Sequence, residues 1–132
     1  MNKWEPYSVK TSLIPDFEIM YEFFGELEGG RKTLPFQGYR CDFKYETFEN
    51  YSDEIYMIWP EFYTNDGSIL LDLEIPVDKQ GKAGMWIVDR TMRTYHRNYF
   101  REGTTGFLVE GPHKVAKVIV TQIVGLFINP IV

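Results

Sequence analysis

Residues 28–45 read EGGRKTLPFQGYRCDFKY and give the clearest indication of structure in this chain of 132 residues. The glycines at positions 29 and 30 indicate a turn, because glycine accepts backbone angles that other residues avoid. From Tyr39 to Tyr45, apolar or aromatic side chains alternate with charged ones. Successive residues of a strand point to opposite faces of a sheet. We therefore predict a strand over 39–47 with one core face and one solvent face.

Further apolar runs with strand character lie on both sides of this segment. We expect strands at 17–24, 54–59, 69–75, 106–110 and 115–124. Pro60 and Pro76 are expected to end the runs that precede them, because proline cannot donate to a strand ladder. Within the last run, 118–124 is apolar on both sides apart from Thr121 and Gln122. That pattern is typical of a central strand covered on both faces.

Between residues 84 and 103 the spacing changes. Apolar residues recur there at steps of three and four: Val88, Met92, Tyr95 and Tyr99. Such spacing is typical of a helix with one apolar stripe. We predict a helix over 88–102, capped by Asp89 and stopped by Gly103. Its exposed side would carry His96 and four arginines: Arg90, Arg93, Arg97 and Arg101.

Composition agrees with a fold made of strands. Aromatic residues make up 17% of the chain and charged residues 25%, and large rings pack well on half-buried pleated surfaces. The length suits one domain. We therefore predict a single all-β domain over 1–132, a six-stranded antiparallel β-barrel with one helical insertion at about 84–103. The formal net charge of -5 disfavours non-specific binding to nucleic acid.

The sequence offers little for catalysis, metal binding or membrane insertion. Cys41 is the single cysteine, and its place in the alternation predicts a buried structural thiol. His96 and His113 fall on different predicted elements, so we expect no metal site. No phosphate-binding loop or other cofactor motif occurs, and no run is apolar enough for a secretory signal or a membrane span. We expect a cytoplasmic protein that is not an enzyme and has no catalytic residue and no cofactor.

Three segments resemble the third, C-terminal domain of translation elongation factor Tu, in the order of that family: 28–45, 65–76 and 107–124. The resemblance implies a six-stranded antiparallel barrel that stands alone, without the GTPase domain. In that family the barrel contacts the T stem of aminoacyl-tRNA, and a basic pair on the double-glycine turn takes part. Carried over, Arg31 and Lys32 are that pair and Thr33 follows it. Cys41 and Asp42 stand where the family has proline and glutamine.

The candidate binding residues lie on this turn, on the strand after it and on the predicted helix: Arg31, Lys32, Thr33, Arg40, Arg90, Arg93, Arg97 and Arg101. Guanidinium groups favour carboxylates, phosphates and aromatic faces. Alternatively, the helix arginines pair with carboxylates of the barrel itself, such as Asp72 or Glu74.

We expect a non-catalytic, stand-alone binding module for a protein partner, either one related to translation or a toxin that this chain neutralises. Two alternatives stay open, an RNA- or tRNA-binding module and a small enzyme with an unrecognised site. Homo-oligomerisation through the apolar tail at 126–132 also stays open.

Overall fold

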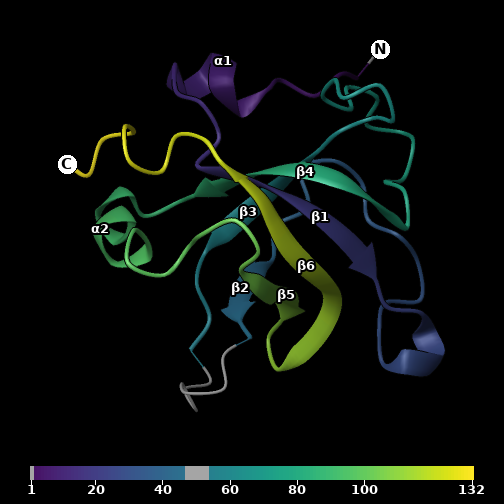
Figure 1. Cartoon of the computed structure of the whole chain (residues 1–132). Coiled ribbons are helices and arrows are strands. Elements are labelled where there is room, and N and C mark those ends of the chain that lie inside the picture. Colours follow the sequence, from purple (N-terminus) through teal and green to yellow (C-terminus); the bar gives the residue numbers. More distant parts are fainter. Residues whose placement is uncertain (1, 47–53) are drawn as a thin grey trace.

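The computed structural model describes residues 2–46 and 54–132 (Figure 1). In chain order, the elements are α1 (Tyr7–Thr11), β1 (Phe17–Phe23), η1 (Glu26–Glu28), β2 (Asp42–Tyr45), β3 (Ile58–Phe62), β4 (Gln80–Ile87), η2 (Arg90–Met92), α2 (Arg93–His96), β5 (Thr105–Glu110) and β6 (His113–Ile123). The end of the strand predicted over 39–47 lies outside the described residues.

The six strands form one antiparallel sheet in the order β2-β5-β6-β1-β4-β3, curled into a half-barrel (Figure 1). This confirms the prediction of an all-β, barrel-like fold. At one point the two ends of the sheet meet, because Phe43 of β2 exchanges both backbone hydrogen bonds with Tyr56, two residues before β3, at 2.8 and 2.9 Å. Curling therefore satisfies backbone groups that a flat sheet would leave free at its edges.

The concave side of the sheet is filled with aromatic and aliphatic side chains. Phe17, Ile19, Tyr21 and Phe23 alternate along β1, and all of them are buried. The Phe17 ring lies 4.2 Å from the Phe100 ring between centroids, and Phe100 closes this end of the core. The predicted alternation of β1 is confirmed, and Cys41 is buried as expected.

The N-terminal segment covers one part of the outer face. Trp4 donates from Nε1 to the buried Glu61 of β3 at 2.6 Å, and the Tyr7 backbone N–H donates to the same carboxylate at 2.9 Å. The Tyr7 ring packs edge-on against Trp86 of β4, with centroids 5.6 Å apart. Glu61 of β3 and Trp86 of β4 are thereby buried on the outer face, whereas Lys82 of β4 is exposed and Met20 of the neighbouring β1 is half exposed.

One predicted strand is absent, and one observed strand was not predicted. Residues 69–75 form no strand, and so the second segment of the elongation factor resemblance, 65–76, contains turns and isolated bridges. There the Asp72 carboxylate accepts from the Glu74 N–H at 2.8 Å, a local bond that competes with strand pairing. The missed strand is β4, whose glycines at 81 and 84 and outward-facing but buried Trp86 obscure the alternation.

The position of Pro60 and the exposure of β6 also differ from the predictions. Pro60 lies inside β3 instead of ending it, which an edge strand permits because one side of its backbone needs no ladder partner. The last strand, β6, is covered on one side only: Val118 and Val120 are buried, and Ile119 between them is 41% exposed.

The predicted helix over 88–102, and with it the insertion at 84–103, was too long. Residues up to 87 belong to β4, and helical structure covers only η2 and α2. Asp89 does cap this segment, because its carboxylate accepts from the Thr91 N–H at 3.1 Å. The buried positions of this segment are Arg93, His96 and Phe100 rather than the predicted apolar stripe, and the Phe100 N–H still donates to the His96 carbonyl at 3.0 Å before the chain leaves the helical turns.

Within the part of the chain that the structure describes, no helix is long and apolar enough to cross a membrane.

Candidate functional site

The predicted basic turn is held by the chain's own side chains. Arg31 forms an ion pair with Glu110 of β5, with 2.5 Å between Nη1 and Oε2, and donates from Nε to the Thr33 carbonyl at 3.0 Å. Burial acts to raise the pKa of the Glu110 carboxyl, but hydrogen bonds from Tyr39 and Arg31 outweigh it and lower that pKa. Of the predicted group on this turn, Lys32 and Thr33 remain exposed.

Arg40 is exposed, but it too has an aromatic neighbour. Its guanidinium lies 4.3 Å from the centroid of the Trp59 ring on β3. This contact links the entry to β2 with β3, at the place where the two ends of the sheet come together. The structure therefore gives Arg40 a packing role against Trp59.

Three of the arginines at 84–103 donate to the C-terminal tail, and Arg101 donates to carbonyls of its own segment. Arg93, expected on the exposed side, is 3% exposed; it donates to Asp16 at 2.7 Å and to the Pro130 carbonyl at 2.6 Å. Arg97 donates to the Leu126 and Asn129 carbonyls at 2.8 and 3.1 Å. Arg101 and Arg90 also donate to backbone carbonyls, those of 97 and 100 and that of 132.

These two basic groups do not form one surface. The turn at 29–33 follows the C-terminal end of β1, whereas α2 lies near the opposite end of the same strand (Figure 1). Neither Asp72 nor Glu74 pairs with the arginines among the described residues; Arg93 pairs instead with Asp16. Sequence spacing alone could not reveal this partner, which lies 77 residues away from Arg93.

His96, also expected on the exposed side, is 1% exposed. Its Nδ1 and the Tyr45 hydroxyl share a hydrogen bond of 2.6 Å. Burial lowers the pKa of His96 to about 4, with a smaller opposing effect from Asp16. Burial also disfavours the charged form of Cys41 and so raises the pKa of its thiol. Both groups are enclosed and uncharged at neutral pH, so neither is presented to a substrate.

No group of three or more histidine, cysteine, aspartate or glutamate side chains in 2–46 and 54–132 is arranged to hold a metal ion.

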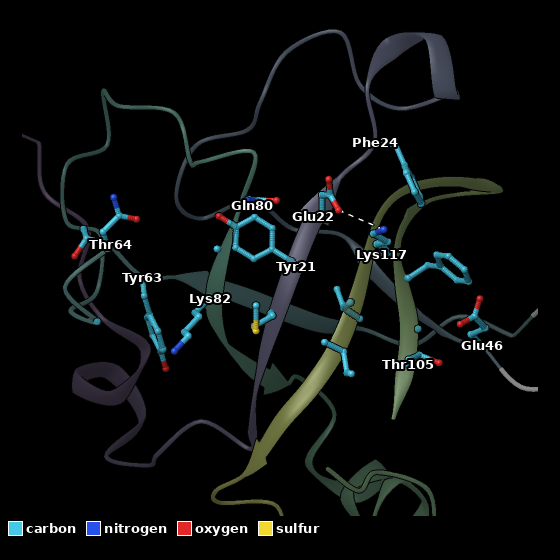
Figure 2. A pocket seen from close by; sticks show the side chains of 18 of the residues that line it. Tyr21, Glu22, Phe24, Glu46, Tyr63, Thr64, Gln80, Lys82, Thr105 and Lys117 are labelled. Atoms are coloured by element: carbon cyan, nitrogen blue, oxygen red, sulfur yellow. Dashed lines mark ion pairs between the residues drawn. The ribbon is translucent and has the colours of Figure 1, made fainter. Parts of the chain in front are cut away.

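The strongest candidate site is a hollow of about 930 Å³ on the outer face of the sheet (Figure 2). One row of residues crosses its floor from strand to strand: Lys82 on β4, Met20 on β1, Ile119 on β6 and Thr105 on β5. Met20 is 51% exposed and Ile119 41% exposed. Two large apolar side chains therefore lie uncovered in the middle of a sheet face.

A second row and two walls complete this outer-face hollow. Gln80, Glu22, Lys117 and Phe107 follow one another across the same four strands, and Glu22 and Lys117 form an exposed ion pair of 3.3 Å (Figure 2). The Phe24 ring lies 6.4 Å from the Phe107 ring and borders one side. Tyr63 and the turn after it border the other. An apolar floor with polar groups around it is typical of binding sites.

One sequence pattern relates to this hollow, but it was interpreted as a buried strand. The two-sided apolar character of 118–124 predicted a strand covered on both faces, but the outer face of β6 has no cover. In β1, Met20 stands among Glu18 and Glu22 on the otherwise polar face. Exposed apolar residues at such positions indicate an interaction surface rather than a core.

A scan against protein-family models finds no match for this chain, and a search of curated proteins finds no similar sequence.

Proposed function

We propose that this chain is a non-catalytic binding module for a protein partner, and that the outer-face hollow is its contact surface. The observation that carries the proposal is the pair of half-exposed side chains, Met20 and Ile119, on the floor of the hollow. A partner that covers them removes apolar area from water. The similarity to the third domain of elongation factor Tu, a translation-related or toxin partner and a cytoplasmic location belong to the same proposal.

The charge distribution favours a protein over RNA as the partner. Arg93 and Arg97 satisfy their guanidinium groups on the chain's own tail, and Arg31 is paired with Glu110. The hollow contains lysines but also Glu22, and the whole chain carries a formal net charge of -5. Binding to a phosphate backbone needs several free cations on one face.

The test is affinity capture from an extract of the native cells, with the intact chain and two hollow variants, Met20→Asp and Ile119→Asp. A carboxylate on the floor would have to be buried without a partner, so we expect capture to fall at least tenfold. The chain offers matched controls: Met57 is 54% exposed and Ile55 is 41% exposed, and both lie outside the hollow.

Met57→Asp and Ile55→Asp are expected to capture as the intact chain does. Thermal unfolding of all four variants separates loss of binding from loss of fold. Equal capture by hollow variants and controls would reject the hollow as the contact surface.

A further inference from the structure

We infer that the outer-face hollow takes an extended peptide segment with an apolar centre, an acidic side chain at the β4 end and a basic side chain at the β2 end. This rests on the proposed function and specifies the chemistry of the partner. The floor row from Lys82 to Thr105 has an apolar middle, and the charged groups on either side of it are those of Lys82 and Glu46.

The two ends of the row carry opposite charges. Lys82 lies at the β4 end, and no other described residue engages its ammonium group in a hydrogen bond or ion pair. At the other end Glu46 follows β2 and is joined to the row by a hydrogen bond of 3.1 Å from its backbone N–H to the Thr105 carbonyl. Its carboxylate is equally unengaged within the described residues. Figure 2 shows these two side chains on opposite sides of the hollow.

Other charges of the hollow are already satisfied. Glu22 and Lys117 pair with each other across β1 and β6. Asp66 accepts hydrogen bonds from Thr64 and Ser68 in its own turn, and these bonds lower its pKa to about 2. Lys82 and Glu46 are therefore the charges that remain for a ligand, and a ligand with complementary ends would engage both.

The length of the row fits a short extended segment. Neighbouring strands lie about 4.8 Å apart, so four spacings from Lys82 to Glu46 give roughly 19 Å. An extended chain rises about 3.3 Å per residue, so roughly six residues cross this distance. A long-chain carboxylate has a similar length, but its apolar tail would end at the Glu46 carboxylate. Because the hollow has a charged group at each end, a peptide with two charged ends fits it better than a long-chain carboxylate does.

The experiment titrates the full-length, ¹⁵N-labelled chain with three synthetic ten-residue peptides that share an alternating valine–threonine centre. The bipolar peptide has two lysines at one end and two glutamates at the other, and the remaining two have lysines or glutamates at both ends. We expect the bipolar peptide to bind about fivefold more tightly than the others, the size expected for exposed charge pairs. Amide shifts should centre on Met20 and Ile119.

Charge reversal tests the assignment of each end. In Lys82→Glu both ends are acidic, and the all-lysine-ended peptide should bind best. In Glu46→Lys both ends are basic, and the all-glutamate-ended peptide should bind best. The double variant should again prefer the bipolar peptide. Lys79→Glu, an exposed lysine outside the hollow, should keep the order of the intact chain.

An order of peptides that stays the same in all variants would overturn the inference, as would shifts centred elsewhere or no binding of any peptide. Capture of the native partner separates this inference from the proposed function. If Met20→Asp abolishes capture while the charge reversals leave both capture and peptide order unchanged, the contact surface stands and the bipolar segment is rejected. If Met20→Asp leaves capture unchanged, the proposed function itself fails.

Discussion

Asp16 and Arg93 join three parts of the chain that are far apart in sequence. The Asp16 carboxylate, 0% exposed, accepts from Arg93, from Asn129 at 3.0 Å and from the Ile87 N–H at 2.8 Å. We predict that Arg93→Ala lowers the free energy of unfolding by about 3–5 kcal/mol, because it leaves a buried charge without its counter-ion. Urea denaturation measures this.

The exposed pair of Glu22 and Lys117 provides the control for this prediction. Water screens both side chains, so Lys117→Ala should change the free energy of unfolding by less than about 1 kcal/mol. Similar losses for Arg93→Ala and Lys117→Ala would contradict the structural role assigned to the buried pair.

His96 makes stability depend on pH. Its pKa is about 4 in the folded chain, below the ordinary value of 6.5, so between these two values the unfolded chain binds a proton that the folded chain does not. Stability should therefore fall as the pH drops through this window, by about 3 kcal/mol between pH 7 and pH 4. The measurement is the free energy of unfolding of the intact chain at each pH, compared with that of His96→Gln. This variant does not titrate and keeps an acceptor near the Tyr45 hydroxyl. A difference between the two proteins that does not change with pH would contradict the prediction.

At the scale of elements, the double-glycine turn offers a test with neighbouring residues. A Cβ atom on Gly30 would lie 2.2 Å from the Phe24 carbonyl oxygen, whereas one on Gly29 would meet nothing within 4 Å. Gly29 has φ of 89°, which alone costs about 1 kcal/mol when another residue adopts it. We predict that Gly30→Ala destabilises by about 3 kcal/mol or more and Gly29→Ala by about 1 kcal/mol. Thermal unfolding gives both values, and a larger loss for Gly29→Ala would refute the close approach.

Elements were predictable from sequence where one face is buried and the other is wet. β1 follows this rule, with buried Phe17 and Tyr21 on one side and Met20 on the other. β4 does not, because Tyr7 from the N-terminal segment buries Trp86 on the outer face. In the helical segment the predicted stripe is not the buried face, because Arg93, His96 and Phe100 are buried whereas Val88 and Tyr99 are exposed. Tertiary contacts determine the structure of both segments, and the local sequence pattern does not reveal those contacts.

At the scale of the molecule, candidate site residues were chosen from charge, and charge alone does not distinguish a free cation from a paired one. Arg93 and Arg97 are engaged by a tail more than twenty-five residues further along the chain. Sequence analysis did not select Lys82. Its ammonium group is unengaged among the described residues because its cross-strand neighbour on β1 is the uncharged Met20. Sheet register determines such neighbours, and a slip of one residue in the pairing changes all of them.

The small number of free cations predicts weak binding to nucleic acid. Among the eight residues proposed from sequence, Lys32, Thr33 and Arg40 are exposed, and Arg31 is held by Glu110. Arg90 and Arg101 are also exposed, but both donate to backbone carbonyls. Two or three phosphate contacts produce weak binding, and the surrounding negative charge weakens it further. We expect no retention of tRNA in a gel-shift assay at about 50 mM salt. The paired variants Lys32→Ser and Arg40→Ser should behave as the intact chain does. Retention that disappears by about 200 mM salt and is reduced in these variants would restore RNA as the partner, and the outer-face hollow would then need a different explanation.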